Sequence, residues 1–224
     1  MSIYHLEDTN RNARPGAAMT TTTTAPVKAP QATREYRKFT VDEYFRMVKA
    51  GILQEDERVE LIEGDILVMP PMDYPHSSGI MRHIRIFRQF PVEQFALLIQ
   101  APLPLGSSSA PEPDLALLRY REDDYSDGFP SPDDVLLVIE VAYSSLAYDR
   151  DVKAHIYGRA NIPETWVLNL RGDCIERFTE PGPEGYAQHT VLRRGDKVTP
   201  VALPDMELAV EDLLPPVQSV AEGE

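Results

Sequence analysis

The chain has 224 residues, 42% of them hydrophobic and 26% charged, which is the composition of an ordinary globular protein with room for one sizeable core. Its formal net charge of −14 argues against wholesale, non-specific binding to nucleic acid, because such binding relies on Lys and Arg to neutralise phosphates. No apolar run approaches the roughly 18 residues of a membrane-spanning helix, and the N-terminus lacks the apolar core of a secretory signal, so we expect a cytoplasmic protein without a membrane partner.

The acidic charge still allows a local basic cleft, or a metal site that supplies its own positive charge. Cys174 is the only cysteine, which excludes an intrachain disulfide and a zinc site built from thiolates. A lone cysteine can be a nucleophile or a small buried residue, and buried residues of this kind are the commoner case.

Composition divides the chain into three parts. Residues 1–33 are a mixture of Thr, Ala and Pro without apolar periodicity, which predicts a disordered tail. Residues 34–214 carry the periodic segments and are predicted to form a single domain. Residues 215–224 begin with two prolines and are predicted to be frayed.

The domain begins with a helix and a hairpin. Thr40 and Glu43 have the spacing of a capping box, and Gly51 lies where a helix C-terminus favours a residue with positive φ. The segment RVELIEGDILVMP then alternates around Glu-Gly-Asp, which predicts a β-hairpin between Val59 and Val68.

The remaining elements predict a mixed α/β domain. A helix is expected from His76, and a surface loop rich in Asp, Ser, Gly and Pro over residues 121–134. The predicted strands cover residues 95–105, 112–120, 135–142, 164–170, 174–178, 185–192 and 206–210, with a helix over about 147–160 and a final turn at 211–213. We therefore expect a mixed central sheet with helices on its faces.

One carboxylate stands inside the most apolar of these strands. Glu140 interrupts the run from Val135 to Val141, and Asp114 opens the preceding strand. If the two strands pair across the long loop, these carboxylates become neighbours, and their repulsion raises a pKa unless a cation lies between them. Oxygen ligands of this kind suit Mg²⁺ or Mn²⁺.

A lysine follows on the next predicted helix. Lys153 lies beside an apolar stripe that includes Tyr148 and Ile156, so its stem can cover apolar surface while its ammonium reaches the strand ends. The plainer alternative is a surface ion pair with Asp149 at i, i+4, which would add only a few tenths of a kcal/mol.

Three blocks of sequence carry a resemblance to a known family. They are ERVELIEGDILVMPPMDYPHS, PEPDLALL and LLVIEVAYSSLAYDRDVKAHIYGRANIPETWVLNL. In this order they resemble the Uma2 family of endonucleases, which belongs to the PD-(D/E)-x-K superfamily with the restriction-endonuclease-like fold. The resemblance covers roughly residues 37–213.

The resemblance implies a set of site residues. Asp114 matches the aspartate of the PD motif, Glu140 the second metal ligand, and Glu60 the N-terminal glutamate that helps to position a metal or water. The usual lysine position, two residues after the glutamate, is occupied here by Ala142. The Uma2 pattern places the lysine on the following helix, which matches Lys153.

Two further residues belong to this implied site. His76 falls where the family tends to have a histidine after the hairpin, although a lone histidine at a helix start is more often a surface or capping residue. Tyr157 is expected to face the same side as Lys153. Arg82, Arg85 and Arg88 recur every three residues on the helix from His76, and they either contact phosphates or form a solvated face.

The implied activity is metal-assisted hydrolysis of phosphodiester bonds. Mg²⁺ or Mn²⁺ held by Asp114, Glu140 and Glu60 would activate a water, and Lys153 would orient it or stabilise the transition state. The implied partner is nucleic acid, in the first place DNA, and a homodimer is compatible with the fold. The alternative is a catalytically inactive scaffold of the same fold that serves as a binding or assembly module.

Overall fold

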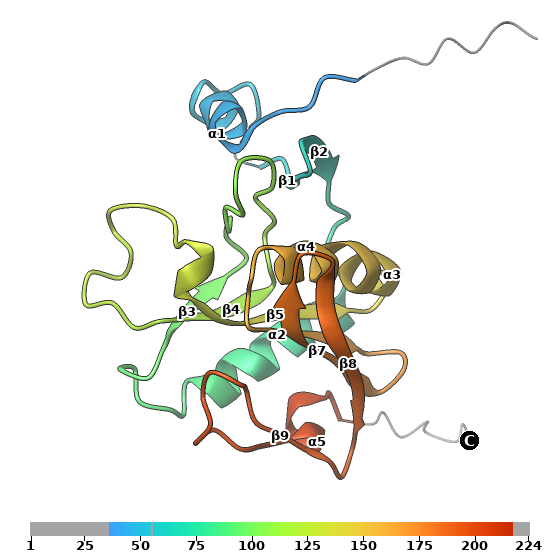
Figure 1. Ribbon diagram of the computed structural model, residues 1–224. Helices are drawn as coiled ribbons and strands as arrows, with labels where there is room; N and C mark the ends of the chain where they lie inside the picture. The colour runs from blue at the N-terminus through green and yellow to red at the C-terminus, as the bar shows by residue number, and fades with distance from the viewer. Residues whose placement is uncertain (1–35, 55, 217–224) are drawn as a thin grey trace, which may run out of the picture. The chain divides into compact units, whose positions relative to one another are not determined.

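The computed structural model describes residues 36–54 and 56–216 (Figure 1). The chain separates into two units, Met1–Tyr36 and Arg37–Glu224, and every helix and strand described below belongs to the second. The predicted tail over residues 1–33 lies outside the described residues, as does most of the predicted frayed C-terminus, residues 217–224. None of the helices in the described ranges has the length and apolar character needed to cross a bilayer.

A six-stranded mixed sheet forms the centre of the second unit, in the order β3-β4-β5-β6-β7-β8. Only β5 and β6 are parallel among the neighbouring pairs, and the other pairs are antiparallel. The strands are β3 (Ala96–Ile99), β4 (Leu115–Leu118), β5 (Val135–Ala142), β6 (Glu164–Asn169), β7 (Cys174–Gly182) and β8 (Gly185–Arg193). This arrangement confirms the predicted mixed sheet with helices on its faces.

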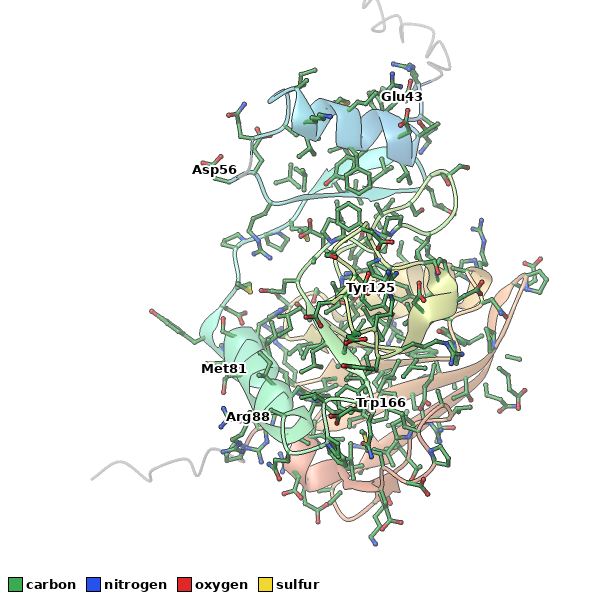
Figure 2. All side chains as sticks on the ribbon, turned by 90° about the vertical axis from the view of Figure 1, so that its left-hand side faces the viewer. Glu43, Asp56, Met81, Arg88, Tyr125 and Trp166 are labelled. Carbon is green, nitrogen blue, oxygen red and sulfur yellow. The ribbon has the colours of Figure 1, made fainter. Side chains whose placement is uncertain are left out.

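The central strand β5 is buried along its whole length, and alternation sends its side chains to two cores. Leu137, Ile139 and Val141 join a core with helices α2 (Tyr74–Phe87) and α5 (Val210–Leu213), and Trp166 of β6 lies in the same core (Figure 2). Val138 faces the other way, into a core with Ile156 and Tyr157 of α4 (Ala154–Arg159). Figure 1 shows α2 and α4 on opposite sides of the sheet. Glu140, two residues after Val138, points to the α4 side.

The predicted hairpin is confirmed as β1 (Val59–Ile62) and β2 (Asp65–Val68). Its two-residue turn, Glu63–Gly64, has positive φ at both positions, as a type I′ turn requires. Helix α1 (Val41–Lys49) has the predicted capping box of Thr40 and Glu43 and packs on β1. The loop before β4 is tied to β1 by a hydrogen bond from Ala110 N to Leu61 O of 2.8 Å. The hairpin is thereby held beside the segment that leads to Asp114.

Helix α2 begins two residues before the predicted start at His76. The side chain of Asp73 accepts a hydrogen bond from the backbone N–H of His76, and Pro75 lies in the first turn, both of which stabilise the earlier start. Met81 and Arg88 lie on the exposed side of α2 (Figure 2). Within the predicted arginine stripe, Arg82 is half-buried and donates to the backbone O of Asp212 at 2.5 Å, so it is not a free phosphate contact.

The predicted helix over 147–160 is one continuous helical segment in which a π-helical turn separates two α-helical parts. It consists of α3 (Leu146–Tyr148), a π-helical turn η2 (Asp149–Lys153) and α4.

Strand β9 (Lys197–Val198) was not expected, and it pairs with β10 (Leu208–Ala209), which is shorter than the strand predicted over 206–210. Cys174 is buried in β7, as the plainer alternative for this residue expects.

Candidate active site

All five residues that the sequence singles out line one pocket of ≈ 90 Å³. They reach it from separate parts of the fold: the hairpin strand β1, the first turn of α2, the loop before β4, the end of β5, and η2. These residues are Glu60, His76, Asp114, Glu140 and Lys153. The fold therefore collects them from a span of more than ninety positions in the chain.

Asp114 and Glu140 are neighbours because β4 and β5 pair as antiparallel strands across the loop, which was the condition for their proximity. Leu115 lies opposite Ile139, which places Asp114 next to Glu140 across the ladder. The backbone N–H of Asp114 donates to Glu140 Oε2 at 3.4 Å, and that of Val141 donates to Asp114 Oδ2 at 2.8 Å. Each carboxylate is thus held by the backbone of the other strand, and both are buried.

Lys153 brings its ammonium into the same place. Its Nζ lies 2.8 Å from Glu140 Oε1 and 3.6 Å from Glu60 Oε2, and it donates to the backbone O of Glu112 at 3.2 Å. The side chain is 4% exposed. The alternative of a surface ion pair with Asp149 is therefore wrong: the lysine is buried and its carboxylate partners come from β5 and β1.

The first and last residues of the π-helical turn η2 both have buried side chains. Asp149 and Lys153 are buried, and both line the pocket. Asp149 Oδ2 accepts a hydrogen bond of 2.5 Å from the hydroxyl of Ser145, one turn earlier. Single π turns inside helices are frequent at functional sites, because they change which side chains share a face. Asp149 therefore lines the pocket, whereas its i, i+4 spacing to Lys153 indicates only a surface ion pair.

Two tyrosines hold the glutamates in place. The hydroxyl of Tyr157 donates to Glu140 Oε1 at 2.7 Å, which confirms that it faces the same side as Lys153. The hydroxyl of Tyr148 donates to Glu60 Oε1 at 2.9 Å, a contact that its place in the apolar stripe did not reveal. Glu60 Oε2 also accepts from the backbone N–H of Glu112 at 3.2 Å. Both glutamates are therefore oriented by neutral donors as well as by the lysine.

His76 lines the pocket next to Asp114. Its Nε2 is 2.8 Å from Asp114 Oδ1, which Gln100 also approaches at 3.3 Å. Burial lowers the pKa of His76, but the hydrogen bond and charge of Asp114 outweigh this, and the net shift is upward. His76 is therefore a site residue rather than only a member of the helix cap.

The pocket carries an excess of negative charge. Its lining contains six carboxylates and two permanently charged bases: Glu60, Asp73, Glu112, Asp114, Glu140 and Asp149 against Arg58 and Lys153. Burial raises the pKa of Glu140 to about 8 even though Lys153 opposes the shift, and burial also raises the pKa values of Asp149 and Glu112. Burial would lower the pKa of Lys153, but attraction to Glu140 and then Glu60 outweighs it, so the net shift is upward and the lysine keeps its proton.

The donor set suits a hard divalent cation. Asp114 and Glu140 offer carboxylate oxygens side by side, and the surplus of acids over bases is reduced when a cation joins them. In the parts of the chain that the structure describes, no three His, Cys, Asp or Glu side chains already converge as a complete metal-binding group. Lys153 stands between Glu60 and Glu140, so the role of Glu60 as a third ligand stays a prediction.

Comparison with solved structures identifies the fold. The chain is similar to a structure titled "Crystal structure of a putative nuclease belonging to DUF820 from Anabaena variabilis ATCC 29413 at 1.96 A resolution", with a TM-score of 0.59 and 16% identity, over 78% of this chain and 97% of that one. The two proteins therefore share a fold.

The family follows from the sequence match. The model of the Uma2 family, described as "Putative restriction endonuclease", matches residues 41–211. The chain therefore belongs to the Uma2 family. A search of curated proteins found no match.

Proposed function

We propose that this chain is a metal-dependent nuclease that hydrolyses phosphodiester bonds in nucleic acid, with the pocket around Glu140 as its active site. One observation carries the proposal: the ammonium of Lys153 is held by Glu140 and Glu60 next to Asp114, with all four side chains buried. Four charged residues from distant parts of the chain are brought together where water is scarce, which is costly for folding and typical of catalytic sites.

A purely structural ion pair would have a different composition. Where buried charges serve only the fold, as for Glu164, the carboxylate is satisfied by an arginine and neutral donors, here Arg177, Trp166 and the backbone of Val201. The pocket instead has more carboxylates than bases. This surplus favours a site that takes up a further cation.

Asp114 and Glu140 are the residues that would hold Mg²⁺ or Mn²⁺. When bound, such an ion polarises the phosphate and lowers the pKa of a water that attacks the phosphorus. In the hydrolysis, the attacking water loses one proton while its oxygen forms a bond to phosphorus, the bond from phosphorus to the leaving oxygen breaks, and the leaving oxygen takes up a proton.

The other pocket residues have roles that follow from their contacts. Lys153 places a fixed positive charge where negative charge builds on the phosphate oxygens. Tyr157 orients the Glu140 carboxylate, and Tyr148 orients Glu60. His76 lines the pocket beside Asp114 and can hold a proton at Nε2, so it is positioned to serve the leaving oxygen.

Nuclease assays with matched variants test this proposal. Supercoiled and linear DNA, single-stranded DNA and RNA are incubated with the purified protein and Mg²⁺ or Mn²⁺. Wild type should cleave at least one of these. Asp114→Asn and Lys153→Met should each lower the rate by about a hundredfold or more, because each removes a charge that acts on the transition state. The exposed pair member Lys197→Met is the control and should keep full activity.

Two outcomes would contradict the site assignment. Cleavage that persists unchanged in both Asp114→Asn and Lys153→Met would show that another part of the preparation cuts the substrate. Absence of cleavage of every substrate, with folded protein, would favour the inactive scaffold.

A further inference from the structure

A second hollow is lined partly by residues that neighbour the active-site residues in the sequence. It measures ≈ 690 Å³, and its walls include Tyr74, Pro75, Tyr143, Leu170, Arg194 and Pro215. This volume lies within the roughly 300–1,000 Å³ of ordinary small-ligand sites. The proposed chemistry makes no use of it.

The two hollows share their chain segments. Asp73 and His76 line the active-site pocket, while Tyr74 and Pro75 between them line the second hollow. In the same way Ser144 lines the first and Tyr143 the second. Tyr143 follows Glu140 by three positions, at the end of β5. Both segments therefore connect the lining of the active-site pocket to the lining of the second hollow.

Two tyrosines line this hollow. Tyr74 is 95% exposed, so nearly its whole ring faces solvent. Tyr143 is half-buried, and the guanidinium of Arg171, which lies outside the lining, covers one side of its ring at 4.5 Å from the centroid. Exposed aromatic rings and guanidinium planes are the surfaces on which unpaired nucleobases stack.

The charge of the hollow points to stacking rather than phosphate capture. Arg194 is tied to Asp173 by paired hydrogen bonds, so these two charges satisfy each other. Binding of duplex DNA depends mainly on free Lys and Arg that neutralise phosphates, and this chain has a net charge of −14. Stacking needs no surplus of positive charge, but it does need bases that are not already paired and stacked in a duplex.

We propose that Tyr74, Tyr143 and Arg171 form a stacking platform for unpaired bases, and that the substrate of this site is a nucleic acid with a single-stranded segment next to the cleaved bond. The inference rests on the proposed nuclease function for the identity of the ligand. It goes further by naming the substrate class and three residues that recognise it.

The test is a binding measurement that does not depend on cleavage. A fluorescent oligothymidylate of twelve nucleotides, with phosphorothioate linkages that resist hydrolysis, is titrated with the full chain in Mg²⁺ and followed by anisotropy. The same strand paired with its complement is the duplex probe. The single strand should bind at least tenfold more tightly than the duplex. Tyr74→Ala and Tyr143→Ala should each weaken single-strand binding by roughly 5- to 150-fold, the range that follows from the loss of one stacked base.

Conservative and remote variants make the result specific. Tyr74→Phe and Tyr143→Phe keep the ring and should stay within about twofold of wild type, because stacking depends on the ring rather than on the hydroxyl. Tyr120→Ala removes an exposed tyrosine that does not line this hollow and should leave binding unchanged. Equal or tighter binding of the duplex, or unchanged binding in both alanine variants, would overturn the platform.

The outcomes separate this inference from the proposed function. If wild type cleaves nucleic acid but the tyrosine variants bind normally, the platform is wrong and the nuclease proposal stands. If the alanine variants lose single-strand binding although no substrate is ever cleaved, the platform stands and the nuclease proposal is wrong.

Discussion

Glu140 is a carboxylate in the middle of a strand that is otherwise apolar and buried throughout. Its oxygens contact the ammonium of Lys153, the hydroxyl of Tyr157 and, at longer range, the backbone N–H of Asp114. These donors explain how the residue is tolerated, yet burial still leaves its pKa raised to about 8. A strand that served packing alone would have an apolar residue here, which is why the proposed function centres on this position.

His83 shows how a buried titratable group outside the site affects stability. It is fully buried on α2, its Nδ1–H donates to the backbone O of Gly79 at 2.8 Å, and its Nε2 has no hydrogen-bond partner among the described residues. Burial lowers its pKa from 6.5 to about 4. Between these values the unfolded chain binds a proton that the folded chain does not. The free energy of unfolding therefore falls as the pH drops from 6.5 to 4.

We predict that His83→Leu reduces this pH dependence. The histidine alone should account for about 3 kcal/mol of stability lost across the window, as the pKa difference implies. Urea denaturation of wild type and variant at pH 7 and pH 4 measures the difference. Replacement of His155, which is exposed on α4, provides the control. The same loss of stability in wild type and His83→Leu would show that His83 is not the group responsible.

At the scale of elements, the helical segment after β5 decides which side chains reach the site. The sequence shows an i, i+4 apolar stripe through Tyr148 and Ile156, and this predicts a regular α-helix. The π turn η2 adds one residue to the winding without changing composition, so spacing alone does not reveal it.

The start of α2 differs from the prediction for another reason. The predicted start at His76 rests on apolar spacing alone, whereas the helix-start residues Asp73 and Pro75 lie just before it.

Parts of the site were predictable for physical reasons that can be named. The approach of Asp114 to Glu140 follows from local pairing of two strands across one loop, which period-2 alternation indicates. The approach of Glu60 to Lys153 depends on how the hairpin is tied to the loop before β4, a long-range contact that spacing does not encode. Glu60 entered the prediction only through the resemblance to the Uma2 family, whereas the place of Lys153 beside the apolar stripe also indicated it. Tyr148 was not predicted as a site residue because it fits the apolar stripe of the helix, and Asp149 was not because its spacing also fits a surface ion pair.

The position of α4 depends on a glycine at its contact with β8. A Cβ built at Gly158 would lie 2.6 Å from the backbone C of Gly185 and 2.7 Å from the backbone N of Tyr186. Backbone atoms of a strand cannot rotate away, so a larger residue must push the helix off the sheet. Since the same helix carries Tyr157, this displacement also disturbs the contact with Glu140.

We predict that Gly158→Ala lowers the free energy of unfolding by about 1–3 kcal/mol through this overpacking. Gly128→Ala is the matched control, because a Cβ at that glycine meets nothing within 4 Å. Chemical denaturation of the two variants gives the comparison. Equal stability of Gly158→Ala and Gly128→Ala would mean that the contact between α4 and β8 adjusts without cost.

At the scale of the whole molecule, the net charge of −14 and the acidic pocket have to be reconciled with a polyanionic substrate. A divalent cation in the pocket reduces the repulsion there, because it offsets the carboxylates and attracts a substrate phosphate. Outside the pocket, stacking of substrate bases on the proposed platform adds affinity without basic side chains. The predicted homodimer and the preference for DNA stay predictions.

The most direct test of the metal-dependent site is a calorimetric titration of the apo protein with Mn²⁺. Wild type should show binding to a specific site, and Glu140→Gln and Asp114→Asn should each abolish it, because each removes one of the two adjacent carboxylates. Asp173→Asn, which alters an acid outside the pocket, should bind like wild type. Mn²⁺ binding that is undetectable in wild type, or that survives in Glu140→Gln, would contradict the assignment of this pocket as a metal-dependent active site.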